Sequence, residues 1–238
     1  MQMLMSWYTS KQDVPNRDII PYMGLIDVFY PKICVGCRQE GAYICLDCQK
    51  KLIKPEEICP ACRTSSLGGW VHRRCSTRYG MDRLLVGLPY RGMVQDCLKK
   101  VKYKSAREIV DFLFQLCRFD LEGGVVTDVP MYRQKALERG FNQAELIARV
   151  LARHTGLPYI PLLARVVQTR PMYGLSTRER VDNVRDAFRF LGSDAGVVRG
   201  QRVILIDDIW TTGATLRECT QVLKRAGASE VWVVVLAR

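Results

Sequence analysis

The sequence predicts an α/β fold in which a mainly parallel sheet is flanked by helices and preceded by a small N-terminal cysteine-rich module. Two observations predict it. From residue 81 onward, short β-branched hydrophobic runs alternate with amphipathic stretches, as strands and helices do in a layered α/β domain. Before that point, seven of the ten cysteines lie between Cys34 and Cys75, mostly in pairs separated by two residues. The pattern indicates one core-forming domain with a compact module ahead of it.

Length and composition agree with this division. The chain has 238 residues, of which 48% are hydrophobic and 25% charged, as in an ordinary globular protein. We expect an N-terminal tail at residues 1–24, the cysteine-rich module at 25–80 and the core-forming domain at 81–238. Close hydrophobic residues at 25–29 predict a short helix that Pro31 ends.

The charge of the chain points to an anionic partner. Its 36 Lys and Arg outnumber 24 Asp and Glu, which gives a formal net charge of +12, or roughly +9 if the cysteine module binds metal as thiolates. Phosphate, pyrophosphate or nucleic acid would suit such a surplus. The sequence has no apolar stretch of ~18 residues and no secretory signal at its start. We therefore expect a cytoplasmic protein without membrane insertion.

Hydrophobic periodicity places the elements of the main domain. Apolar residues at three- and four-residue spacing predict helices, two of which end near Gly156 and Gly227. Strands are predicted at 84–90, 125–130, 159–165, 202–207 and 231–236, and helices at 93–103, 106–119, 142–156 and 214–227. The last two strands are unbroken hydrophobic runs, which is typical of parallel strands buried on both faces.

The cysteines of the N-terminal module form two quartets with the spacing of structural zinc sites. In each quartet, one CxxC pair and a second pair separated by two residues could complete a tetrahedron around one ion. The expected ligands are Cys34, Cys37, Cys45 and Cys48 in the first quartet and Cys59, Cys62, His72 and Cys75 in the second. A closed site of this kind folds a module that is too small for a core. His72 could instead be a surface residue, but its spacing from Cys75 repeats the pair geometry.

A second motif lies at residues 203–215, VILIDDIWTTGAT. A buried strand leads into two adjacent acids, Asp207 and Asp208, and then into a small-residue loop that opens a helix. Backbone N–H groups and hydroxyls at a helix start favour a phosphate, and the loop residues are Thr211, Thr212, Gly213, Ala214 and Thr215. The acids could accept hydrogen bonds from ribose hydroxyls or lie behind a hydrated magnesium ion. The alternative is a strand end with two solvated acids and an ordinary turn.

This motif resembles the binding motif for phosphoribosyl pyrophosphate (PRPP) in type I phosphoribosyltransferases. Unlike a Walker loop, it has no Gly-Lys-Ser/Thr. GLIDVFYPKICVGC, the quartets, PYRGMVQDCLKKVKYKS, VPMYRQKALERGFNQAELIARVLA and LSTRERVDNVRDAF resemble, in order, the pattern of the ComF family of competence-associated proteins. The resemblance covers nearly all of the chain after about residue 24. It implies a type I phosphoribosyltransferase-like domain behind a double zinc ribbon.

The resemblance also implies further site residues. A turn after Pro130 would face the pyrophosphate, with Arg133, Lys135, Arg139 and Gly140 in contact with it, and Asn142 could cap the following helix. The polar stretch 168–184 resembles the mobile hood that covers PRPP, with Thr169, Leu175, Ser176 and Arg178 matching the family pattern. The family commonly has glutamine at the position of Met172, so the usual polar contact of the hood is in doubt. The alternative for Arg133, Lys135 and Arg139 is that they are solvated residues on the protein surface.

Two functions from different classes follow. In the first, the chain is a phosphoribosyltransferase, a pentosyl-class glycosyltransferase that binds PRPP with magnesium and releases pyrophosphate. In the second, suggested by the family's link with natural transformation, the chain binds single-stranded DNA and competence or recombination proteins. The PRPP pocket would then sense PRPP or have only a structural role. The basic segment KKVKYK from Lys99 and the arginines at 73 and 74 would suit phosphate-backbone contact. A redox role for the CxxC pairs is disfavoured because they form two quartets.

Overall fold

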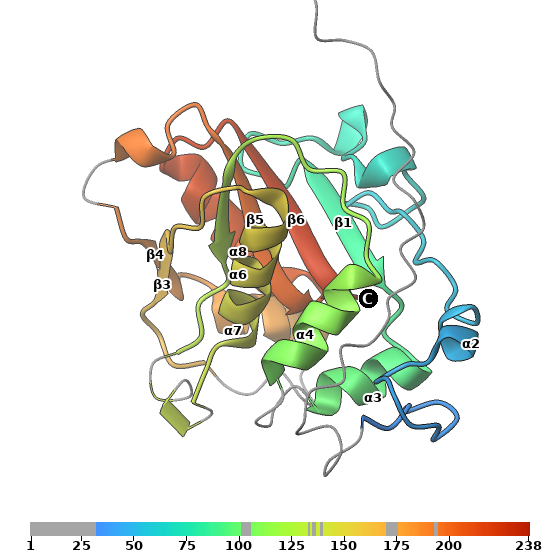
Figure 1. The fold of residues 1–238 in the computed structure, drawn as a ribbon. Coiled ribbons are helices and arrows are strands. Elements are labelled where there is room, and N and C mark those ends of the chain that lie inside the picture. Colours follow the sequence, from blue (N-terminus) through green and yellow to red (C-terminus); the bar gives the residue numbers. More distant parts are fainter. Residues whose placement is uncertain are drawn as a thin grey trace, which may run out of the picture.

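The computed structural model describes most of the core-forming domain and of the cysteine-rich module (Figure 1). The described residues are 32–100, 106–132, 134, 137–138, 140–169, 176–192 and 195–238. The expected tail at 1–24 and the short helix at 25–31 lie outside these ranges. Among the described helices, none is both long and apolar enough to cross a lipid bilayer.

A four-stranded parallel sheet forms the centre of the molecule, as the sequence predicted. Its order is β1 (Arg83–Leu88), β6 (Glu230–Ala237), β5 (Arg202–Ile209) and β2 (Val125–Asp128). The two C-terminal strands occupy the middle, where Val203 lies opposite Val231. Seven of the eight residues of β6 are buried, because helices or the cysteine module cover both faces of the sheet.

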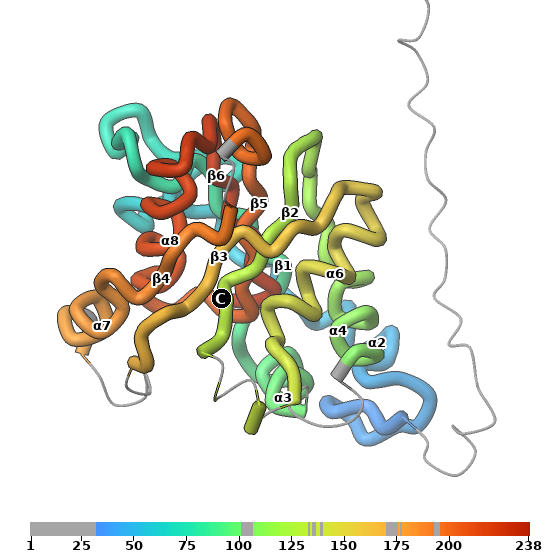
Figure 2. Tube along the Cα trace, turned by 90° about the vertical axis from the view of Figure 1, so that its left-hand side faces the viewer, coloured from blue at the N-terminus to red at the C-terminus, as the bar shows by residue number. Residues whose placement is uncertain are grey.

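Helices cover the two faces of the sheet. On one face, α6 (Gln143–Thr155) packs against β5 and β2, α4 (Ala106–Gln115) packs against α6, and α3 (Gly92–Lys100) packs against α4. On the other face, α8 (Ala214–Arg225) packs against β5 and β6, and α7 (Thr177–Val184) packs against α8. Figure 2 shows these two layers on opposite sides of the strands.

The side chains of β5 show why this strand separates two cores. Ile204 and Ile206 belong to the core under α6, whereas Val203 and Leu205 belong to the core under α8. This alternation follows from the two-residue period of a strand. The two aspartates follow in the same strand, close to its end at Ile209, so both lie at the carboxyl edge of the sheet.

The predicted strand at 159–165 is wrong as a single strand. Tyr159 forms an isolated parallel bridge with Val126 at the edge of the main sheet. Only β3 (Leu163–Arg165) is a regular strand, and it pairs antiparallel with β4 (Phe188–Phe190) in a separate two-stranded sheet. Pro161, which lacks an N–H donor, lies between the two pieces, so the ladder cannot continue through it. Strand β4 was not among the predicted strands, because its three residues are too few to show a period.

The cysteine-rich module is attached to the sheet through Arg83 of β1. The Arg83 guanidinium lies over the indole rings of both Trp70 and Trp232, 4.9 and 4.7 Å from their centroids, and the residue is only 7% exposed. Its Nε donates to the Gly68 carbonyl at 2.8 Å, within the short 3-10 helix η1 (Leu67–Gly69). A Cβ at Gly69 would lie 1.9 Å from the Leu84 carbonyl oxygen, so the module touches the strand backbone there.

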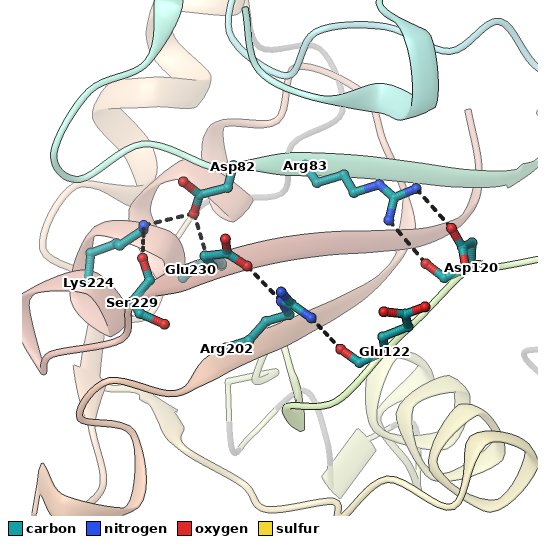
Figure 3. Close-up of polar contacts among 9 residues, drawn as sticks. Asp82, Arg83, Asp120, Glu122, Arg202, Lys224, Ser229 and Glu230 are labelled. Atoms are coloured by element: carbon teal, nitrogen blue, oxygen red, sulfur yellow. Dashed lines mark hydrogen bonds and ion pairs between the residues drawn. The ribbon is translucent and has the colours of Figure 1, made fainter. Parts of the chain in front are cut away.

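Ion pairs also join elements at the amino edge of the sheet (Figure 3). Asp82 accepts hydrogen bonds from the Val231 backbone N–H and from Lys224 Nζ, both at 2.7 Å. Arg202 pairs with Glu230 at 2.7 Å. These contacts lie at the edge opposite to the carboxyl ends of the strands, which leaves the carboxyl edge open for the site described next.

Candidate functional site

Asp207 and Asp208 end the central strand β5 at the carboxyl edge of the sheet, where ligands of open α/β sheets bind. Burial, followed by the neighbouring Asp208, raises the pKa of Asp207 well above its usual range, and Arg165 opposes this shift. The side chain of Asp207 accepts from the Asp208 backbone N–H at 2.9 Å, and that of Asp208 accepts from the Ile209 N–H at 2.7 Å. The strand end therefore holds two fixed acceptors.

The loop after β5 leads directly into α8. Gly213 is the N-cap of this helix, with a left-handed φ of 69°, and it offers no side chain to cap the helix N–H groups. A Cβ at this position would also lie 2.6 Å from the Trp210 ring, so both the backbone and the packing require glycine. The Ala214 N–H at the helix start donates instead to the Thr212 hydroxyl of the loop, at 3.4 Å.

The strand end and the loop share one hollow. It measures about 30 Å³ and is lined by Asp207, Ile209, Thr211, Thr212, Gly213, Ala214, Thr215 and Leu216. The structure thus brings together the five loop residues and the first of the two acids. A larger hollow, of about 620 Å³, lies between the first quartet and α4, and residues from the end of β5 do not line it.

The end of the neighbouring strand β2 carries a buried carboxylate, Asp128, which was not among the predicted site residues. Asp128 is only 7% exposed, and burial raises its pKa. It accepts hydrogen bonds from the Tyr159 hydroxyl and from the side-chain amide of Asn142, both at 2.8 Å. Asn142 caps α6 as expected, accepting from the Ala144 N–H. An acid that ends a hydrophobic run, followed by a helix-capping residue, was the signal available for Asp128.

The segment that would face pyrophosphate follows this braced strand end. Arg133, Lys135 and Arg139 lie outside the described residues. Gly140 is described, with a left-handed φ of 80° and open space where a Cβ would be. The positive φ favours glycine at this position. The space around it does not require glycine, because no atom lies close to an added Cβ.

The stretch expected to form a hood contains regular structure. Its residues 177–184 form helix α7, which begins with a capping box between Ser176 and Glu179. The pattern Ser-x-x-Glu before a helix was the sequence signal for this element. Thr169 accepts a hydrogen bond from Arg165, and the Arg178 side chain is exposed. Leu175 and Met172 lie outside the described part of the chain.

Both cysteine quartets form compact clusters. In each, the four candidate ligand atoms lie within 4.8 Å of one another. The Sγ atoms of Cys37 and Cys45 are 3.5 Å apart, and Cys62 Sγ lies 3.4 Å from His72 Nδ1. A tetrahedral ion with bonds of about 2.3 Å would hold its ligands about 3.8 Å apart, so both clusters have the size that a metal requires.

The second cluster shows how His72 is oriented. Its Nε2 lies 3.1 Å from the Ser65 carbonyl, which makes Nε2–H the donor and leaves Nδ1 for the metal. Hydrogen bonds from the Thr64 hydroxyl and backbone N–H lower the pKa of Cys62 to about 6. This donor set of thiolates and imidazole is the one that zinc takes in closed sites.

The three cysteines outside the quartets do not belong to either cluster. Cys97 and Cys219 are fully buried, and burial raises the pKa of Cys97 and Cys117 to about 12. They pack as small apolar side chains, as expected. All ten cysteines are free of disulfides.

Comparison with known proteins identifies the class. The phosphoribosyl transferase domain model matches residues 137–238, which include the end of β5 and the loop. DNA utilization protein YhgH of Salmonella typhi is 35% identical over 225 residues, covering 87% of this chain and 97% of that protein. Competence protein F of Haemophilus influenzae is 36% identical over 114 residues, which are 48% of this chain and 49% of that protein.

Among solved structures, the allosteric regulatory enzyme of purine biosynthesis aligns with a TM-score of 0.37 and 30% identity, over 56% of this chain and 25% of that chain. The fold and the matched domain define a protein with a phosphoribosyltransferase-type domain and two metal-binding clusters. The chain belongs to the ComF family.

Proposed function

We propose that this ComF-family protein binds PRPP with Mg²⁺ and transfers the phosphoribosyl group to an acceptor with release of pyrophosphate. One observation carries the proposal. The central strand ends in two adjacent carboxylates, and Asp207 shares a hollow with the glycine-threonine loop that opens α8. The match of residues 137–238 to the phosphoribosyl transferase domain model supports it.

Each part of the site has a role in this proposal. The 5-phosphate binds at Thr211–Thr215, where backbone N–H groups and hydroxyls face an anion. The hollow is too small for a whole sugar phosphate, so the ribose lies outside it, where its hydroxyls donate to Asp207 and Asp208. Arg133, Lys135, Arg139 and Gly140 contact the pyrophosphate, and the stretch with Thr169, Leu175, Ser176 and Arg178 closes over the ligand.

The reaction exchanges one bond at the anomeric carbon. The bond to the pyrophosphate oxygen breaks, a bond to the acceptor nucleophile forms, and the acceptor releases its proton. Mg²⁺ neutralises charge on the leaving group when it is bound. The side chains position the sugar and stabilise charge. The acceptor is a nucleophile such as a purine-like base or an amine.

The two cysteine clusters bind zinc in this proposal, with a structural role. Each has four protein ligands and therefore no open position for a substrate. The thiolates and His72 are the donors, and the fixed imidazole orientation supports His72 as the fourth ligand of the second site.

Titration calorimetry with PRPP and Mg²⁺ tests the proposal. The wild-type chain should bind, and a double variant with Asp207→Asn and Asp208→Asn should not. The variant keeps the shape of both side chains but removes two charges, so far-ultraviolet circular dichroism serves as the folding control. Equal affinity of both proteins, or no binding by the wild type, would contradict the proposal.

A second candidate function is binding of single-stranded DNA, in a protein of natural transformation with competence or recombination proteins as partners. The names of the relatives, Competence protein F and DNA utilization protein YhgH, support it. One surface feature favours it. Tyr79 is 38% exposed, and the guanidinium groups of Arg78 and Arg225 lie 5.4 and 5.7 Å from its ring centroid. Bases could stack on such an aromatic platform beside cations.

Fluorescence anisotropy with an oligo-dT strand separates the two functions. If DNA binds at Tyr79, then Tyr79→Ala should weaken binding roughly tenfold, because base stacking on an aromatic ring is worth about 1–3 kcal/mol. Affinity should fall as salt rises. The double Asp variant should keep its DNA affinity. Of the basic segment from Lys99, only Lys99 and Lys100 are described, both exposed on α3.

A further inference from the structure

The turn that carries Cys59 and Cys62 of the second cluster is in direct contact with the loop that precedes α8. Arg63 follows the ligand Cys62, and its guanidinium donates to the backbone carbonyl of Thr212, 149 residues further along the chain. Arg217, in the first turn of α8, donates to the same carbonyl at 3.0 Å. Two guanidinium groups, one from each part of the molecule, therefore hold a single carbonyl of the loop.

The cluster fixes where Arg63 lies. The backbone N–H of Arg63 donates to the Cys59 carbonyl at 2.9 Å, which closes the turn that presents the first two ligands. Arg63 has a left-handed φ of 65° in this turn. A metal ion on Cys59 and Cys62 would hold the turn closed. The cluster would thereby fix the position of the Arg63 backbone, from which the side chain extends.

Because Arg63 and Arg217 hold the Thr212 carbonyl, they also orient the N–H group of Gly213. The peptide bond between Thr212 and Gly213 is planar and trans, so its carbonyl and its N–H point in opposite directions. The carbonyl oxygen faces both guanidinium groups, of which that of Arg63 belongs to the cysteine module. The Gly213 N–H is thereby directed away from the module, and Gly213 is one of the residues that line the hollow.

The charges at this contact favour an anion. Among the described residues, neither Arg63 nor Arg217 forms an ion pair with a carboxylate. Burial, followed by the nearby Arg63, lowers the pKa of Arg217. Two like charges beside one loop repel each other, and a bound phosphate in the adjacent hollow would relieve this repulsion.

We propose that Arg63 is a positioning residue of the phosphate loop, through which the second metal cluster sets the geometry of the loop. This inference rests on the proposed function, because it assigns the loop to a phosphate. Arg63 acts through the Thr212 carbonyl and does not itself contact the ligand.

The first quartet supplies a matched control. Arg38 follows Cys37 as Arg63 follows Cys62, has a left-handed φ of 70°, and donates its N–H to the Cys34 carbonyl at 2.9 Å. Arg38 is exposed and does not line the hollow. Glycine suits a left-handed φ at both positions, so Arg63→Gly and Arg38→Gly should both keep the turn and the bound metal. Metal content per chain checks this.

Two measurements on the metal-loaded full chain test the proposal. Hydrogen exchange of the peptide that spans 207–216 should be faster in Arg63→Gly than in Arg38→Gly, and Arg63→Lys should restore part of the protection. Ribose 5-phosphate, used as the probe in titration calorimetry, should bind roughly three- to tenfold more weakly to Arg63→Gly, as expected for loss of one exposed charge-assisted hydrogen bond. The Arg38→Gly protein should match the wild type.

The outcomes distinguish the positioning role of Arg63 from the proposed function of the loop. Equal exchange in Arg63→Gly and Arg38→Gly would overturn the positioning role, whatever the ligand does. If the wild type does not bind ribose 5-phosphate but the exchange of Arg63→Gly is faster, the proposed function fails at this site while Arg63 still positions the loop. If Arg63→Gly speeds exchange yet binds the probe as tightly as Arg38→Gly, the coupling to phosphate binding is wrong.

Discussion

The side-chain amide of Asn142 donates to the carboxylate of Asp128 at 2.8 Å, and this hydrogen bond joins the end of β2 to the start of α6. The same Asn142 side chain accepts from the Ala144 N–H as the helix cap. One residue therefore satisfies both a buried acid and a helix N-terminus. The contact fixes the strand end from which the proposed pyrophosphate segment departs.

Replacing Asn142 with alanine should lower the free energy of unfolding by about 2–3 kcal/mol, because it removes a cap and a donor to a buried carboxylate. Ser176→Ala is the matched control, since it removes the cap of α7 without exposing a buried acid, and it should cost about 1 kcal/mol. Urea denaturation measures both. Equal losses in the two variants would mean that the Asp128 contact adds nothing to stability.

Asp207→Asn should raise the free energy of unfolding at neutral pH by about 1 kcal/mol while it abolishes PRPP binding. Burial and Asp208 raise the pKa of Asp207, so the folded state binds this proton more tightly than the unfolded state does. The wild type should therefore lose stability relative to the variant as pH rises from the ordinary carboxyl pKa of 3.8 through the raised value. Urea denaturation across this range checks the sign. A stability difference that does not change with pH would show that Asp207 titrates normally.

Gly213→Ala should destabilise the protein by about 3 kcal/mol and weaken ligand binding, because its Cβ would meet the Trp210 ring at 2.6 Å. Gly156→Ala separates this clash from the backbone effect. Gly156 has a similar φ of 72° but no atom within 4 Å of an added Cβ, so this variant should cost about 1 kcal/mol. Thermal unfolding and titration with PRPP compare the two. Similar losses in both variants would mean that the loop moves freely around an added methyl group.

The purified chain should contain two zinc ions, and Cys48→Ser should reduce this to one. A chelator should make residues 32–80 sensitive to protease, since a module of this size depends on its metal for folding. Cys97→Ser is the control, because Cys97 lies in the core beside the first cluster without belonging to it. Metal analysis by mass spectrometry gives the count. A wild-type content below one ion per chain would refute the zinc assignment.

Motifs whose residues are close along the chain could be predicted from the sequence. The spacing of the quartets predicted clusters that the structure forms, and the run from Val203 to Thr215 predicted a buried strand, a loop and a helix in the right order. In both motifs the relevant residues are close along the chain, so their spacing fixes their geometry. The strand predicted at 159–165 failed because its second half pairs with β4, which lies more than 20 residues away in sequence.

The sequence by itself determined the two cysteine clusters, the parallel α/β fold and the acidic strand end before a glycine-threonine loop. Only the tertiary structure decided which distant groups meet. Arg83 packs on the rings of Trp70 and Trp232. Tyr159 and Asn142 donate to Asp128, and Arg63 donates to the Thr212 carbonyl. The physical reason is that these contacts depend on strand order. β6 lies between β1 and β5, which brings the first strand and the cysteine module beside the last two strands. Local hydrophobic period carries no information about that order.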